Sequence, residues 1–199
     1  PDALPIREDA AQRPINPYGR SKLMCEEVIR DVAGTGTVSA VLLRYFNAAG
    51  ADPDGEIGED HDPETHVIPL ILRAARAGAE PVRIFGDRHP TPDGTCVRDY
   101  IHVTDLADAH VRGVTRIPAS GVAAYTLGTG EGVSLRELLR GCGEVAGHPV
   151  PFIIAEPRPG DPPILVADAA LARRELGWTP RHSGVDEILR TAYAWISTR

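Results

Sequence analysis

The stretch Ser39-Ala40-Val41-Leu42-Leu43-Arg44-Tyr45-Phe46 is a nearly continuous apolar run, and it decides the fold class. Such a run is typical of a strand buried on both faces, as in a parallel sheet covered by helices. The preceding segment predicts a helix that begins after the N-cap Asn16, with Pro17 in the first helical position, and runs to about Val32. A helix that leads into a buried strand is the closing portion of a βαβ unit, so we expect earlier strands of the sheet to lie upstream.

The rest of the chain alternates helix and strand patterns, which predicts an α/β fold. Residues 48–66 are rich in Gly, Pro, Asp and Glu and predict a long loop, a feature that is commonly functional. The expected helices cover residues 67–77, 105–117, 135–146, 169–176 and 185–197, and the expected strands cover 82–85, 100–103, 124–127 and 152–155. Ser134 and Glu137 form an S-x-x-E capping box at the start of one of these helices.

Composition narrows the class of protein. The chain has 199 residues, of which 42% are hydrophobic and 25% are charged, as in an ordinary globular protein. Its net charge of -7 argues against a nucleic-acid partner, because phosphate backbones require a basic surface. No apolar run is long enough to suggest a membrane partner. The cysteines are 3 in number and widely spaced, which favours a reducing, cytoplasmic compartment over a disulfide framework.

Tyr18 and Lys22 lie four residues apart on the first helix, so their side chains project from one face. Free tyrosine has a pKa of about 10 and is a poor base at neutral pH. A neighbouring ammonium group favours the phenolate, which can take a proton from a sugar hydroxyl while hydride leaves the same carbon. Y-x-x-x-K alone also fits an exposed helix with an incidental Tyr and Lys, but the buried strand that follows favours a catalytic pair.

Three segments together resemble the UDP-glucose 4-epimerase family of extended short-chain dehydrogenase/reductases. They are N-P-Y-G-R-S-K at 16–22, L-R-Y-F-N at 43–47 and H-P-T-P-D-G-T-C-V-R-D-Y-I-H-V at 89–103. The third segment is the most specific, and the similarity continues to the final helix. The resemblance implies the C-terminal portion of a Rossmann-type enzyme with its smaller α/β substrate-binding domain. Residues 1–50 would be a remnant of the NAD-binding domain, and 51–199 mainly the UDP-sugar-binding domain, with a few segments returning to the Rossmann sheet.

The resemblance also implies a role for each matching residue. Tyr18 would be the base for the sugar 4-hydroxyl, and Lys22 would tune it and bind the nicotinamide ribose. The NAD contacts would be Tyr18, Lys22, Tyr45 and Phe46. The UDP-hexose contacts would be Asn47, His66, Val67, Arg83, Phe85, Arg98, Arg158, Asp161 and Leu165. His66 replaces an Asn found in some members, which leaves its side-chain role open. Without the resemblance, each arginine is more simply a surface or ion-pair residue.

Leu165 occupies the position where the family places a gate beside the hexose. A bulky Tyr there excludes N-acetylated sugars, so the smaller Leu predicts a pocket that tolerates an N-acetyl group. The acidic loop 54–62 invites a metal interpretation, but a solvated loop is the usual explanation and the resembled family needs no metal, so we expect none.

The sequence contains no G-x-x-G-x-x-G segment, which the family uses to hold the NAD pyrophosphate. The densest glycine cluster, Gly128 to Gly132, follows a late strand and has the wrong spacing. We therefore expect this chain alone to be inactive and to expose apolar surface, while the parent enzyme would be a homodimer. The alternatives are a non-catalytic UDP-sugar-binding or assembly module and another nucleotide-sugar enzyme, such as a dehydratase or a decarboxylase.

Overall fold

The computed structural model describes residues 2–76 and 79–198. The helices are α1 (Pro17–Gly34), α2 (Val67–Ala74), α3 (Val103–Thr115), α4 (Leu135–Ala146), α5 (Ala170–Leu176) and α6 (Val185–Ser197). The strands are β1 (Ser39–Tyr45), β2 (Asn47–Ala49), β3 (Val82–Phe85), β4 (Val97–Arg98), β5 (Tyr100–His102), β6 (Gly121–Leu127), β7 (Val133–Ser134), β8 (Phe152–Ala155) and β9 (Ile164–Leu165). Within the described ranges, no helix is both long and apolar enough to cross a lipid bilayer.

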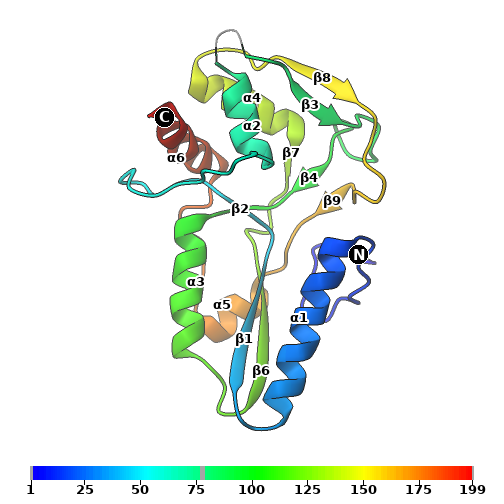
Figure 1. Ribbon diagram of the computed structural model, residues 1–199, viewed down its shortest axis with the longest axis vertical. Coiled ribbons are helices and arrows are strands. Elements are labelled where there is room, and N and C mark those ends of the chain that lie inside the picture. Colours follow the sequence, from blue (N-terminus) through cyan, green and yellow to red (C-terminus); the bar gives the residue numbers. More distant parts are fainter. Residues whose placement is uncertain (1, 77–78, 199) are drawn as a thin grey trace.

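The predicted α/β character is confirmed, and β1 pairs in parallel with β6 over Ser39–Tyr45 and Gly121–Leu127. This two-stranded sheet lies between α1 and α3 in Figure 1, with α5 beside it. We call these five elements the sheet region. Among the described residues, no strand pairs with the other edge of β1.

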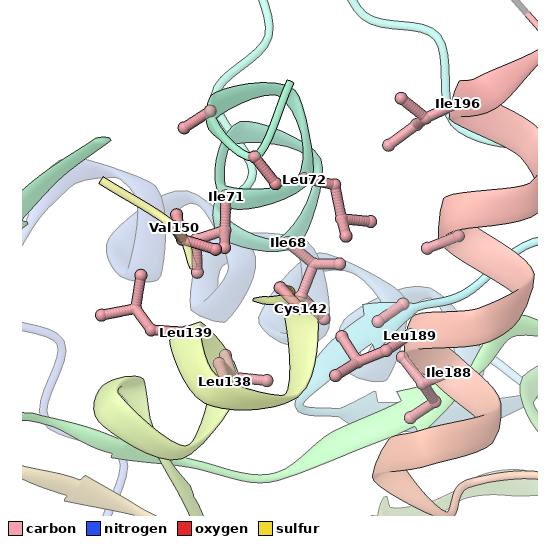
Figure 2. Packing of buried hydrophobic residues seen from close by; sticks show 14 of the residues in the cluster. Ile68, Ile71, Leu72, Leu138, Leu139, Cys142, Val150, Ile188, Leu189 and Ile196 are labelled. Atoms are coloured by element: carbon pink, nitrogen blue, oxygen red, sulfur yellow. The ribbon is translucent and has the colours of Figure 1, made fainter. Parts of the chain in front are cut away.

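A second part of the molecule, which we call the helical region, contains α2, α4 and α6 together with the parallel pair β3 and β8. In Figure 1 it lies at the opposite end from the turn that joins α1 to β1. Its three helices bury their apolar faces against one another, and Figure 2 shows their side chains meeting. The labelled members are Ile68, Ile71, Leu72, Leu138, Leu139, Cys142, Val150, Ile188, Leu189 and Ile196.

Short strands connect the two regions. β2 pairs in parallel with β5, and β4 pairs antiparallel with β7 and parallel with β9. The carboxylate of Asp99, which lies between β4 and β5 and is fully buried, accepts hydrogen bonds from the backbone of Thr129, Gly130 and Ala167. One carboxylate therefore joins its own segment to residues 129–130 and to residue 167 at this junction.

Local signals placed most elements correctly. Asn16 caps α1, Pro17 opens it, and the Ser134–Glu137 capping box is complete. α3 begins two residues earlier than expected, at Val103, because the side chain of His102 caps it by accepting the amide of Thr104. The helix expected over 67–77 ends at Ala74; Ala77 lies outside the described residues. The loop expected over residues 48–66 begins later, because Ala48 and Ala49 belong to the strand β2.

Candidate functional site

The predicted catalytic pair lies in the first two turns of α1. The Asn16 side chain accepts the amide of Gly19 at 2.8 Å, so the helix begins immediately before Tyr18. Tyr18 is 72% exposed, and the Nζ of Lys22 lies 5.3 Å from the centroid of its ring. This distance is within the range of a cation–π contact, so the structure brings the cation and the phenol together as the spacing of four residues predicts.

Tyr18 also lines a cavity of ≈ 480 Å³. Six of the predicted site residues surround it, namely Tyr18, Tyr45, Phe46, Asn47, His66 and Val67. They come from three places in the sequence: the start of α1, the junction of β1 with β2, and the start of α2. The cavity volume is in the range of small-molecule sites, which run to roughly 300–1,000 Å³.

The junction of β1 with β2 positions the middle group. β1 ends at Tyr45, and Asn47 opens β2, donating its amide to the carbonyl of Asp99 at 3.0 Å. Tyr45, Phe46 and Asn47 therefore stand at the carboxyl end of a parallel strand, where open α/β sheets place their ligands.

The start of α2 supplies the third group. His66 is the N-cap with an extended backbone (φ -83°, ψ 141°), and its side chain makes no capping hydrogen bond. Instead, its Nδ1 contacts Oε1 of Glu59. The amino end of α2, with Val67 in its first turn, thus faces the cavity. A helix amino end suits an anion, because its first amides lack partners within the helix.

Arg98, Asp161 and Leu165 form a separate group. Nη2 of Arg98 bonds Oδ1 of Asp161, and the two side chains are 11% and 31% exposed. Leu165 lies opposite Arg98 in the β4–β9 pair. None of the three lines the cavity that Tyr18 lines, although Arg98 lies two residues before its lining residue Tyr100. The guanidinium that would bind a diphosphate is therefore paired with a carboxylate.

Phe85 and Arg158 form a third group. The guanidinium carbon of Arg158 lies 3.8 Å from the centroid of the Phe85 ring, which is a stacked cation–π contact. Arg83 shares the strand β3 with Phe85 but is exposed. These residues do not line the cavity of Tyr18 either. The structure thus brings the predicted residues together in three neighbourhoods.

Sequence reasoning missed several residues of the cavity wall, above all Gly50, Glu59, Tyr100 and Trp195. Gly50 has φ +85°, and a Cβ there would lie 2.6 Å from the ring of His102. A glycine just after a strand was an available signal for a close approach of this kind. Nothing in the sequence showed that Trp195, in the last helix, reaches a loop near residue 59, where its Nε1 donates to the Glu59 carbonyl at 2.8 Å.

Burial keeps three titratable groups, Tyr100, Cys96 and Cys142, in their neutral forms. Burial raises the pKa of Tyr100, so this cavity-lining phenol stays protonated at neutral pH. Burial likewise raises the pKa of the Cys96 thiol, and it raises the pKa of Cys142 to about 12. The two thiols therefore remain neutral packing groups.

The glycines at 128–132 have a packing role. A Cβ on Gly128 would lie 2.3 Å from Cβ of Ala167 and 2.5 Å from a carboxylate oxygen of Asp99. A Cβ on Gly132 would lie 2.4 Å from a methyl group of Val97. These glycines let segments of the junction approach one another.

Comparison with known proteins defines the class first. Residues 1–128 match the model of the NAD dependent epimerase/dehydratase family. The chain belongs to this family.

Several relatives that match nearly the whole chain are UDP-glucose 4-epimerases. That of Azospirillum brasilense is 48% identical over 98% of this chain and 56% of its own length. The Brucella ovis enzyme, solved in complex with NAD, superposes with a TM-score of 0.90 at 50% identity and covers 96% of this chain and 59% of its own. The Bifidobacterium longum enzyme, solved in complex with NAD+ and UDP, superposes with a TM-score of 0.94 at 41% identity. The match covers 100% of this chain and 60% of that enzyme. These similarities confirm the Rossmann-type fold of this part. The chain spans 56% of the length of one curated relative and 61% of the length of another.

Proposed function

We propose that this chain is the C-terminal part of an NAD-dependent UDP-glucose 4-epimerase, which interconverts UDP-glucose and UDP-galactose. The observation that carries the proposal is the Tyr18–Lys22 pair at the mouth of a cavity that the end of β1 and the start of α2 also line. The A. brasilense and B. ovis epimerases support it through their similarity to nearly the whole chain.

The proposed chemistry assigns the proton transfer to Tyr18. Its phenolate oxygen accepts the proton of the sugar 4-hydroxyl, and the phenol returns it when the opposite configuration forms. Lys22 supplies the positive charge that stabilises the phenolate. Bound NAD would supply hydride removal from C4 and hydride return to the other face of the sugar.

The remaining predicted residues would bind the cofactor and substrate. Tyr45 and Phe46 would lie against the nicotinamide, and Asn47, His66 and Val67 would hold the substrate at the amino end of α2. Arg98 and Arg158 would clamp the diphosphate, which then competes with Asp161 for Arg98. Arg83, Phe85 and Asp161 would contact the uridine.

We further propose two domains: residues 1–50 belong to the NAD-binding domain, and 51–199 mainly to the UDP-sugar-binding domain, with β6 returning to the Rossmann sheet. The pairing of β6 with β1 supports this division. A homodimer in the cytoplasm completes the proposal. Met24, Val28 and Val32 recur every fourth residue on α1 and are 58%, 62% and 45% exposed, which supplies an apolar stripe for such an interface.

The test is UDP-galactose conversion by the complete protein with Tyr18→Phe. Phenylalanine keeps the ring and removes the proton acceptor, so we expect kcat to fall by about 10²- to 10⁴-fold. Tyr193→Phe is the matched control, because Tyr193 packs against the helical core and does not line the cavity, and it should keep wild-type kcat. Wild-type protein without 4-epimerase activity, or Tyr18→Phe protein with undiminished kcat, contradicts the proposal.

Substrate range depends on Leu165. This residue is half-buried on β9, opposite Arg98, and it has no aromatic ring to fill the space beside a hexose. We expect the complete enzyme to accept UDP-N-acetylglucosamine as well as UDP-glucose. Good turnover of UDP-glucose with none of the N-acetylated sugar would contradict this expectation.

A further inference from the structure

The loop that leads into α2 gathers four potential metal ligands. Glu59, His61, Glu64 and His66 each offer one ligand atom, and these atoms all lie within 4.8 Å of one another. The carboxylates of 54–62 alone favoured a solvated loop. In the folded chain, Glu59 lies beside two imidazoles, His61 and His66, and the buried carboxylate of Glu64. This mixed set of ligands differs from a solvated row of carboxylates.

The two imidazoles converge on one oxygen. Nδ1 of His61 lies 2.9 Å from Oε1 of Glu59, and Nδ1 of His66 contacts the same oxygen. The rings meet edge to face with centroids 4.9 Å apart. For both contacts to be hydrogen bonds, each Nδ1 must carry a proton and share a single acceptor atom. A cation between the three groups would use both nitrogen lone pairs and the carboxylate together.

Glu64 provides an independent observation. Its side chain is 2% exposed. Its Oε1 accepts the amides of Thr65 and His66 at 2.7 and 2.8 Å and lies 3.7 Å from Nδ1 of His61. Its Oε2 is buried without a hydrogen-bond partner, and Nη2 of Arg73 stands 3.7 Å away. The Arg73 ion pair balances the charge of this oxygen, but a buried carboxylate oxygen without a hydrogen bond is uncommon, and its lone pairs remain open to a metal ion.

The backbone of this loop is held in place by the helical region. Trp195 donates its Nε1 to the carbonyl of Glu59 at 2.8 Å. A Cβ on Gly58 would lie 2.3 Å from the Trp195 ring, so the loop passes closely over α6 at this point. His66 caps α2, whose residues Ile68 and Ile71 are buried in the core. The ligands are therefore attached to a scaffold that is already ordered.

We propose that Glu59, His61, Glu64 and His66 bind a divalent transition-metal ion of the zinc class. Imidazole nitrogens with carboxylate oxygens are ligands that zinc accepts, and four protein ligands make a closed, structural site. Two carboxylates also balance the charge of a divalent ion. Since Glu59 and His66 line the cavity of Tyr18, the ion clamps the loop to the start of α2 at the cavity rim.

The test is direct metal binding, so it does not depend on the proposed epimerase activity. Protein purified without a polyhistidine tag and stripped with a chelator is titrated with Zn²⁺ and with Co²⁺ by calorimetry. We expect one equivalent to bind. His61→Ala should weaken binding at least ~10-fold, because even the loss of a group that only supports a metal ligand costs this much. The control His148→Ala removes an exposed histidine in the turn after α4 and should bind as the wild type does.

Thermal unfolding provides a second measurement. His61 is half-exposed, so its replacement should leave the metal-free protein with the wild-type Tm. Zn²⁺ should raise the Tm of the wild type and of His148→Ala more than that of His61→Ala, because a ligand stabilises the state that binds it, and does so less when its binding is weaker. The proposal is overturned if no stoichiometric binding occurs, if His61→Ala binds as tightly as the wild type, or if His148→Ala loses binding equally.

Discussion

The helical region and the sheet region are held together by different forces. In the helical region, α2, α4 and α6 bury aliphatic side chains against one another, and Leu138, Ile188 and Leu189 have no exposed surface (Figure 2). In the sheet region, α3 and α5 pack on β1 and β6, but α1 buries only Ala33. α1 is held largely through Arg44 on β1, which bonds both carboxylate oxygens of Glu26 at 2.7 and 2.6 Å.

The residues expected to stabilise the fold and those expected to carry the chemistry therefore lie in different parts of the molecule. The larger of the two buried clusters lies in the helical region, whereas the predicted catalytic pair stands on a helix whose buried residue is Ala33. Hydrophobic burial scales with the area removed from water, so truncation in the helical region should cost much more than truncation on α1. Three substitutions test the comparison, in decreasing order of expected effect.

Leu138→Ala should have the largest effect. Leu138 has no exposed surface and faces α2 and α6 from α4, so its truncation leaves a cavity and should lower the free energy of unfolding by about 2–5 kcal/mol. Met24→Ala on α1, where Met24 is 58% exposed, should cost less than about 0.5 kcal/mol. Urea unfolding of both variants gives the two values. Equal losses would mean that α1 is as tightly packed as the core.

Asp99→Asn tests the junction between the regions. The carboxylate accepts from the amides of Thr129, Gly130 and Ala167, and an Asn amide nitrogen would face one of these donors. We expect a loss of about 1–3 kcal/mol, which is the cost of a buried donor left unsatisfied. The control is Asp108→Asn, whose side chain is 45% exposed and pairs with Arg112; it should change little. A neutral Asp99→Asn result in urea unfolding would show that the carboxylate does not hold the junction.

Glu26→Gln should have the smallest effect of the three test substitutions, apart from the controls Met24→Ala and Asp108→Asn. Gln keeps an acceptor for Arg44 but removes the charge, so we expect a loss of about 1 kcal/mol at neutral pH. The hydrogen bonds from Arg44 lower the pKa of Glu26 below its ordinary 4.5. Its stabilising contribution is therefore present above the unfolded pKa and is lost as the pH falls through the folded pKa.

The pH series is the measurement for this substitution. The difference between wild type and Glu26→Gln in the free energy of unfolding should shrink as the pH falls below about 4.5. A difference that is constant down to acid pH would show that the ion pair contributes nothing to the attachment of α1.

The sequence predicted the elements whose signals are local. Asn16 and Pro17 mark the start of α1, the apolar run marks β1, and the capping box marks α4. It failed for β2, β4, β7 and β9, which are two or three residues long and exist because segments distant in sequence pair with them. Such strands carry too few residues to show a period of two.

The candidate site shows the same limit. The Tyr18–Lys22 spacing and the residues after β1 pointed to the cavity, because helix periodicity and the carboxyl end of a strand fix where side chains go. The pairing of Arg98 with Asp161, the closure of the wall by Trp195 and the convergence of His61 and His66 on Glu59 depend on tertiary contacts. No local pattern encodes these contacts.

The parallel pairing of β1 with β6 has a consequence for how the molecule forms. Residues 39–45 cannot form their parallel pair until residues 121–127 are available. The chain between these two strands contains α2, β3 and α3, which belong to both regions. The helical core in turn requires α6, at residues 185–197. The entropy cost of closing such long loops comes before the contacts can stabilise the fold, so we expect slow folding. During synthesis on the ribosome, β1 would be exposed to aberrant strand pairing.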